Sequence, residues 1–122
     1  MKKSFHEKLL ERAKQFLKDA LYDAECRRYD IAIVHLEQAL QLLLKAKIYE
    51  RFGEFPITHN LKILLRTLGE AELVDKRREV INLLESAYLA GRYYDIGYEK
   101  EDFEIVFKFV KEVFEKYGIK IN

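Results

Sequence analysis

Apolar residues recur at intervals of three and four along almost the whole of this chain, and this periodicity constrains the fold more than any other feature. Such spacing places apolar side chains on one face of an α-helix, whereas a strand requires strict alternation. Behind the capping-box pair Ser4 and Glu7, it predicts a helix over residues 5–25. It predicts a second, more completely apolar helix over residues 30–50, which we expect at the centre of the fold.

Three further helices complete the predicted pattern. Gly53 suits the left-handed position that ends the second helix, and Thr58 is the expected N-cap of a short third helix that Gly69 stops. We expect a fourth helix over residues 71–92 and a fifth over residues 100–117. No convincing strand and no internal repeat are found. The sequence therefore predicts an all-α fold, a compact up-and-down bundle of about five helices.

The composition predicts a single globular domain over residues 1–122, because the chain is 49% hydrophobic and 35% charged. Its formal charge of +1 gives no global attraction to nucleic acid, and no apolar stretch is long enough to cross a membrane. Without an export signal, and with Cys26 unable to form an internal disulfide, we expect a cytoplasmic protein. Sparse Asn and Gln beside abundant Lys, Glu and Arg suggest a thermophile as the source.

A polar stripe crosses the apolar second helix. His35, Gln38, Gln41 and Lys45 fall on one side of it at helical spacing. One interpretation is that this stripe faces a ligand, water or another subunit, since buried amides and imidazoles need partners. The simpler interpretation is a solvent-exposed helix face, which is the more frequent role of such stripes.

An arginine and several tyrosines lie together in the segment "YLAGRYYDIGY". Arg92 offers a planar fork for a phosphate, and Tyr93 and Tyr94 offer rings on which a base can stack. This predicts a nucleotide or RNA contact. Tyrosines also close helix ends by packing their rings, and the sequence leaves both interpretations open.

His59 is expected at the start of the third helix. There, free backbone N–H groups would hold an anion beside a neutral imidazole, or the ring would simply pack against the loop. The sequence motifs of other common catalytic and metal sites are missing, because the chain has no glycine-rich phosphate loop, no His-Glu-x-x-His and no Cys pair. We therefore expect no metal site and no cofactor.

The fifth helix has more apolar surface than one contact face requires. Ile105 and Phe109 fall on the flank of its core stripe. They predict a homodimer interface, or else a core contact that is wider than one stripe.

Three stretches resemble the HEPN family, over roughly residues 5–117. "YDIAIVHLEQALQLLLKA" resembles the family's second helix, with an aromatic-Asp pair before His-x-x-Gln-Ala. "PITHNLKILL" resembles its Pro-x-Thr-His-Asp-Leu opening of the third helix, and "LAGRYY" its Ala-Arg-Tyr-Pro close of the fourth. The resemblance makes His59 a family feature that the bundle brings near His35 and Arg92.

The chain departs from the family pattern in ways that bear on catalysis. Asn60 replaces the usual Asp, and no histidine follows Arg92, although many HEPN ribonucleases use an Arg followed after four to six residues by His. Arg28 and His35 have this spacing, but at the head of the second helix and not near the fourth, so we interpret them as a coincidence. We therefore expect no enzyme activity and no catalytic residue, with a metal-independent ribonuclease toxin as the alternative.

The resemblance implies a small cytoplasmic homodimer that accompanies a minimal nucleotidyltransferase, in toxin–antitoxin fashion, and binds a nucleotide. The implied nucleotide-binding residues are Arg92, Tyr93, Tyr94, His35, Gln38, Gln41, Lys45 and His59. A helical protein that serves only as an interaction scaffold is a further alternative.

Overall fold

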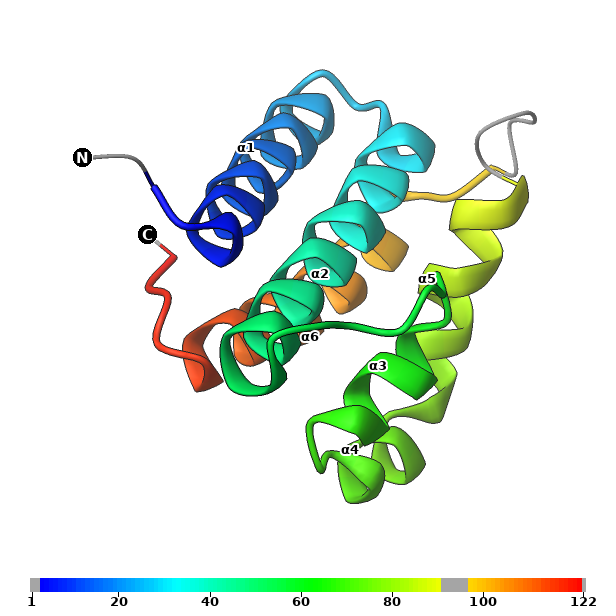
Figure 1. The fold of residues 1–122 in the computed structure, drawn as a ribbon. Coiled ribbons are helices and arrows are strands. Elements are labelled where there is room, and N and C mark those ends of the chain that lie inside the picture. The colour runs from blue at the N-terminus through cyan, green and yellow to red at the C-terminus, as the bar shows by residue number, and fades with distance from the viewer. Residues whose placement is uncertain (1–2, 91–96, 122) are drawn as a thin grey trace.

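The computed structural model describes residues 3–90 and 97–121. Within these ranges there are six helices and no strand (Figure 1). In chain order the helices are α1 (Phe5–Glu25), α2 (Tyr29–Phe52), α3 (Leu61–Thr67), α4 (Ala71–Lys76), α5 (Arg78–Ala90) and α6 (Lys100–Lys116). The prediction of an all-α bundle is confirmed, with one helix more than expected.

The central element is α2, which contacts α1, α3, α5 and α6. Figure 1 shows α1 antiparallel beside it, α6 behind it, and α3 to α5 on the side opposite α1. Its fully buried large side chains are Ile33, Leu36, Leu40, Leu43, Leu44 and Ile48. Each such side chain contributes roughly 1.5–3 kcal/mol on burial, so the nearly continuous apolar surface of α2 holds the other helices around it.

Two helix ends are formed as the sequence predicts. At the start of α1, the hydroxyl of Ser4 accepts a hydrogen bond from the Glu7 N–H at 3.3 Å, and the Glu7 carboxylate accepts one from the Ser4 N–H at 3.4 Å. At the end of α2, Gly53 has a φ of 78°, a left-handed conformation that costs glycine little. Local capping chemistry is therefore enough to define these two boundaries.

The start of the third helix differs from the prediction. Asn60 is its N-cap, because the Asn60 side chain accepts from the Ile63 N–H at 3.1 Å. Thr58 accepts from the Asn60 N–H instead, so the expectation that Thr58 caps this helix is wrong. Burial of Leu61 fixes the first helical residue, and Asn60 directly precedes it. His59 consequently lies in the loop before α3.

The expected fourth helix is two helices. The chain bends at Arg77, where φ is −119° and ψ is 30°, so α4 and α5 have different directions. Val74 before the bend and Ile81 after it are both fully buried, and the bend lets both reach the core. The last two residues of the expected range, 91–92, lie outside the described ranges.

The position of Phe109 decides between the two alternatives given for it. Phe109 is fully buried within this chain, which agrees with the alternative of a core contact wider than one stripe and not with an exposed position at a homodimer interface. The reason is that α6 packs against both α2 and α5, which makes its buried face wider than one stripe. The guanidinium of Arg77 lies 5.0 Å from the centre of the Phe109 ring and covers it further. Ile105 remains exposed.

Candidate functional site

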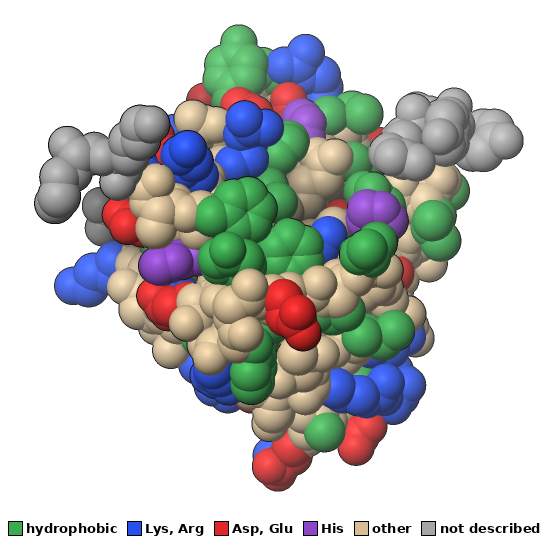
Figure 2. All heavy atoms as spheres, viewed as in Figure 1, with side chains coloured by type: hydrophobic (Ala, Val, Ile, Leu, Met, Phe, Trp, Pro, Cys, Tyr) green, Lys and Arg blue, Asp and Glu red, His purple; other side chains and the backbone are tan. Residues whose placement is uncertain are grey.

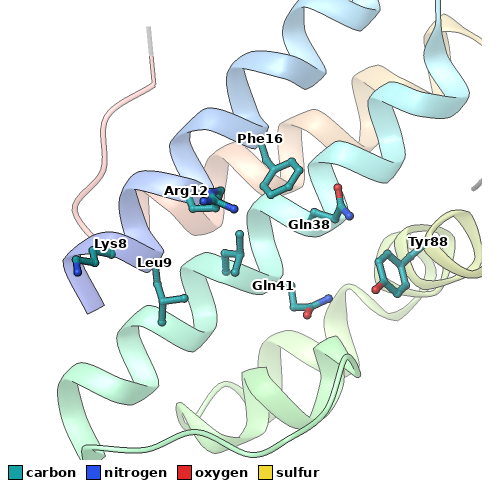
Figure 3. Close-up of a pocket in the computed structure, with 8 residues that line it drawn as sticks. Lys8, Leu9, Arg12, Phe16, Gln38, Gln41 and Tyr88 are labelled. Atoms are coloured by element: carbon teal, nitrogen blue, oxygen red, sulfur yellow. The ribbon is translucent and has the colours of Figure 1, made fainter. Parts of the chain in front are cut away.

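A groove of about 400 Å³ lies between α1 and α2 and is bounded by α5 (Figure 3). Its lining residues are Lys8, Leu9, Arg12 and Phe16 of α1, Gln38, Gln41 and Leu42 of α2, and Tyr88 of α5. The volume is in the range of sites that bind small organic molecules, of the order of 300–1,000 Å³.

Positive charge enters the groove from α1. Lys8 and Arg12 are one helical turn apart and therefore share a face, and Figure 3 shows Arg12 pointing into the gap between the helices. Figure 2 shows Lys and Arg side chains gathered over α1 beside hydrophobic surface over α2. Across residues 3–90 and 97–121, neither cation has an ion-pair partner, and no acidic residue lines the groove. The charge of these two side chains is thus available to an anionic ligand.

Flat aromatic surfaces and amides form the rest of the groove. Phe16 projects from α1 toward α2, and Tyr88 reaches in from α5 toward Gln41 (Figure 3). Gln38 adds a second amide, which offers both donors and an acceptor. Such walls suit a ligand that has both a planar ring and polar edges.

Gln41 connects the groove to a buried polar network. Its side chain is only 6% exposed, and that of Glu37 is fully buried. Lys45 donates to Gln41 Oε1 at 3.1 Å, and Gln41 Nε2 donates to Glu37 Oε2 at 3.2 Å. Because an ammonium group only donates and a carboxylate only accepts, these two partners fix the orientation of the amide. Burial lowers the pKa of Lys45, and the carboxylate of Glu37 partly offsets this effect.

This burial contradicts the simpler interpretation of the polar stripe on α2. Gln41 is not on a solvent face, because α2 is covered by α1 on one side and by α3 and α5 on the other. The four residues of the stripe do not act together either. Gln38 and Gln41 line the groove, whereas Lys45 is held by Gln41 and His35 by a residue of α1.

His59 contacts the network from the loop before α3. Its Nδ1 lies 2.9 Å from Gln41 Oε1, and since that oxygen can only accept, Nδ1 carries the proton. Nε2 of this exposed residue therefore bears a lone pair whenever the imidazole is neutral. The imidazole ring lies 5.7 Å from the ring of Tyr88. The fold thus orients an imidazole acceptor next to the Tyr88 wall of the groove.

The expected free N–H groups beside His59 have partners. The Leu61 N–H donates to the carboxylate of Glu85 at 3.3 Å, and the Ile63 N–H donates to Asn60. A carboxylate therefore occupies the position where the sequence suggested an anion, and the expectation of free backbone donors there is wrong.

His35 belongs to a separate cluster at the other end of α1. Its Nδ1 lies 2.6 Å from an oxygen of Asp23, which is 7% exposed, and Arg28 lies 3.7 Å from the other oxygen. The imidazole of His35 is 5.8 Å from the ring of Phe16, so it lies next to the groove without lining it.

Comparison with models of protein families shows which family the chain belongs to. The model of the HEPN domain matches residues 6–120, which is nearly the whole chain. The chain belongs to the HEPN domain family. No curated protein and no solved structure gives a significant match to it.

Three residues proposed for this HEPN domain cannot be placed. Arg92, Tyr93 and Tyr94 lie outside the described residues, so their role in a site stays a prediction. In the part of the HEPN domain that is described, no three His, Cys, Asp or Glu residues are grouped to hold a metal ion. No helix in that part has the length and apolarity needed to cross a membrane.

Sequence reasoning missed the contribution of α1 to the site. Lys8 lies on the polar face of the helix predicted over residues 5–25, and the sequence gives no sign that it and Arg12 border a groove. A usable signal existed at Glu37, a carboxylate whose helical neighbours Ile33, Val34 and Leu40 are apolar, since a buried charge needs partners nearby.

Proposed function

We propose that this HEPN domain is a nucleotide-binding module without catalytic activity. The observation that supports the proposal best is the groove between α1 and α2, where two cations without ion pairs face aromatic rings and amides. Arginine binds phosphate through a planar fork of N–H donors, and aromatic rings accept a base by stacking. A nucleotide is a ligand that uses both features at once.

In the proposed complex the phosphates lie against Arg12 and Lys8, and the base lies toward Tyr88. Gln38 and Gln41 supply polar contacts from the floor of the groove, with His59 beside them. Arg92 would add a second phosphate contact, and Tyr93 or Tyr94 a second stacking surface. These last three contacts rest on the family resemblance alone.

We further propose a biological setting for this binding. Membership of the HEPN family supports a cytoplasmic homodimer that accompanies a minimal nucleotidyltransferase, as a toxin–antitoxin pair does. A nucleotide held by this domain would then be shared with, or withheld from, the partner enzyme. Co-expression of this chain with a minimal nucleotidyltransferase, followed by co-purification, tests the partnership.

Calorimetric titration of the purified protein with ATP and GTP tests nucleotide binding. We expect Arg12→Ala to weaken binding about tenfold or more, because a charge-assisted phosphate contact is lost. Arg66→Ala is the matched control, since Arg66 is exposed on α3 and does not line the groove. Equal binding by the two variants, or no binding by the wild type, contradicts the proposal.

A metal-independent ribonuclease is the second candidate, and one observation favours it. Arg28 and His35, which have the spacing of the family's nuclease motif, both contact the carboxylate of Asp23. An imidazole held by a carboxylate through Nδ1 can act as a base through Nε2. Cleavage of RNA in EDTA that is lost in His35→Ala would support this candidate, and intact RNA after prolonged incubation would exclude it.

A further inference from the structure

A second, smaller pocket lies on the other side of Tyr88. Its volume is about 200 Å³, and it is lined by Glu37, His59, Asn60, Glu85, Tyr88 and Leu89. Tyr88 lines both this pocket and the groove, and His59 is hydrogen-bonded to Gln41 of the groove. The two hollows are therefore neighbours that share the side chain of Tyr88.

The polarity of three groups in the pocket follows from their existing bonds. His59 donates through Nδ1 to Gln41, which makes Nε2 of the neutral ring an acceptor. Asn60 uses its side-chain oxygen to accept from the Ile63 N–H, which leaves its NH₂ group as a donor.

Glu85 is the third group, and its carboxylate has two contacts that leave part of its hydrogen-bond acceptor capacity unused. One of its oxygens accepts from the Leu61 N–H at 3.3 Å, and the other lies 3.3 Å from the ammonium of Lys62. A carboxylate has about four lone-pair sites, so acceptor capacity remains. These two contacts hold the side chain in place and compensate its charge.

Besides Glu37, whose carboxylate already accepts from Gln41 Nε2, the pocket thus offers two acceptors and one donor beside the ring of Tyr88 and the apolar side chain of Leu89. Among the nucleobases, guanine has the complementary edge: N1–H and N2–H₂ donate, and O6 accepts. Adenine presents a single amino donor on that edge, so one protein acceptor would lose its partner. We propose that this pocket is a base subsite selective for guanine, an inference that rests on the proposed nucleotide binding in the adjoining groove.

In this arrangement the phosphates of a guanine nucleotide lie on Arg12 and Lys8, and its base passes Tyr88 to reach Glu85 and His59. Glu85 accepts from N1–H, and Nε2 of His59 accepts from N2–H₂. Asn60 donates to O6. The same residues that cap α3 therefore determine which base is accepted.

The test compares GTP, ITP and ATP by calorimetric titration of the whole chain at neutral pH. ITP keeps N1–H and O6 but lacks the N2 amino group, so it isolates one predicted hydrogen bond. We expect binding in the order GTP, ITP, ATP, with about a tenfold preference for GTP over ATP. This comparison uses the wild-type protein and does not depend on any variant folding.

Substitutions then test whether this pocket causes the preference for GTP over ATP. Glu85→Gln replaces one acceptor oxygen by an amide donor and should reduce the preference for GTP over ATP at least threefold. Glu79→Gln is the matched control on the same helix, because Glu79 is exposed and does not line this pocket. Arg12→Ala should weaken all three nucleotides by the same factor and leave the order unchanged.

Failure of this inference is distinguishable from failure of the proposed function. Equal affinities for the three nucleotides, all reduced by Arg12→Ala, would overturn guanine selectivity and leave nucleotide binding intact. Absence of any nucleotide binding would overturn both. A GTP preference that survives Glu85→Gln would show that the base is read elsewhere, and would also overturn the assignment of this pocket.

Discussion

The imidazole of His59 and the side-chain amide of Gln41 are 18 residues apart in the chain and 2.9 Å apart in the fold. The amide of Gln41 has only one possible orientation, because Lys45 must donate to its oxygen and Glu37 must accept from its nitrogen. The proton on the imidazole is thus placed by Lys45 and Glu37 of α2, which act through the amide of Gln41. This relationship makes the ring's tautomer a measurable property of the fold.

Gln41→Leu should change that tautomer. Without the amide oxygen, the acceptor that holds the proton at Nδ1 of His59 is lost, and we expect the neutral ring to shift toward the Nε2–H form. Ring ¹⁵N chemical shifts of His59, measured at a pH where the ring is neutral, report the tautomer directly. Gln38→Leu is the control, because Gln38 lines the same groove without contacting His59. An unchanged ¹⁵N pattern in Gln41→Leu would mean that another group fixes the ring.

Tyr117→Phe should reduce the stability of the fold. The hydroxyl of Tyr117 donates to the carboxylate of Glu70 at 2.7 Å and so ties the end of α6 to the corner between α3 and α4. Burial and this hydrogen bond raise the pKa of Tyr117 well above its usual value. A hydrogen bond to a charged group contributes roughly 1.5–3 kcal/mol, so we expect a loss of about 1–2 kcal/mol in the free energy of unfolding. Urea denaturation of the variant and the wild type measures this difference in the free energy of unfolding.

The control for this change is Tyr22→Phe, which removes the same hydroxyl from an exposed ring on α1. Its expected effect is within about 0.5 kcal/mol. Equal losses in the two variants would show that the contact with Glu70 contributes nothing.

Glu70 itself should make stability depend on acid pH. Burial acts to raise the pKa of Glu70, but the hydrogen bonds from Lys116 and Tyr117 outweigh it, and the pKa lies below the usual 4.5. A carboxyl with a depressed folded-state pKa stabilises the protein above its unfolded-state pKa, and this contribution is lost as the pH falls through the folded-state value. Glu70→Gln should therefore lower the melting temperature at pH 7, and the difference from wild type should narrow below about pH 4.5. A difference that is constant between pH 7 and 3 would contradict this.

Where the fold was predictable from the sequence, the information was local. The periodicity and caps of residues 5–25 and 100–117 place α1 and α6 to within one residue. The bend at Arg77 left no such mark, because apolar residues keep helical spacing across it. It follows from where α3 and α6 lie in space, which is tertiary information. The burial of Phe109 between two helices has the same origin.

The candidate site was less predictable, for a related reason. Gln38, Gln41 and His59 were identified by residue type, and the structure places them in or beside the groove. Arg12 was not identified, because a cation on a surface helix has no distinguishing pattern until its neighbours are known. The closeness of Tyr88 to α1 likewise depends on how α5 crosses α2, which spacing along the chain does not encode.

Asp30→Ala should loosen the segment that leads into α6. The carboxylate of Asp30, in the first turn of α2, accepts from the Tyr98 N–H at 2.8 Å and from the Gly97 N–H at 3.3 Å. Its removal leaves backbone donors without these acceptors, which costs about 1–3 kcal/mol. We expect faster hydrogen exchange at the Tyr98 amide and a lower melting temperature. Asp19→Ala, an exposed position on α1, should change neither.

Ile105 and Phe109 were predicted together as a homodimer interface, and their different burial now separates them. Phe109 is fully buried, so Phe109→Ala should cost about 3–5 kcal/mol of stability through the cavity that it leaves.

Ile105 is 56% exposed, so Ile105→Asp should leave the stability of the monomer within about 0.5 kcal/mol. If α6 forms the dimer, burying this carboxylate at the interface should convert the dimer to a monomer, which light scattering after gel filtration measures. Ile57→Asp is the control at a fully exposed isoleucine in the loop before α3, and it should leave the mass unchanged. A dimer that persists in Ile105→Asp would place the interface on another face of the bundle, and a monomeric wild type would remove it altogether.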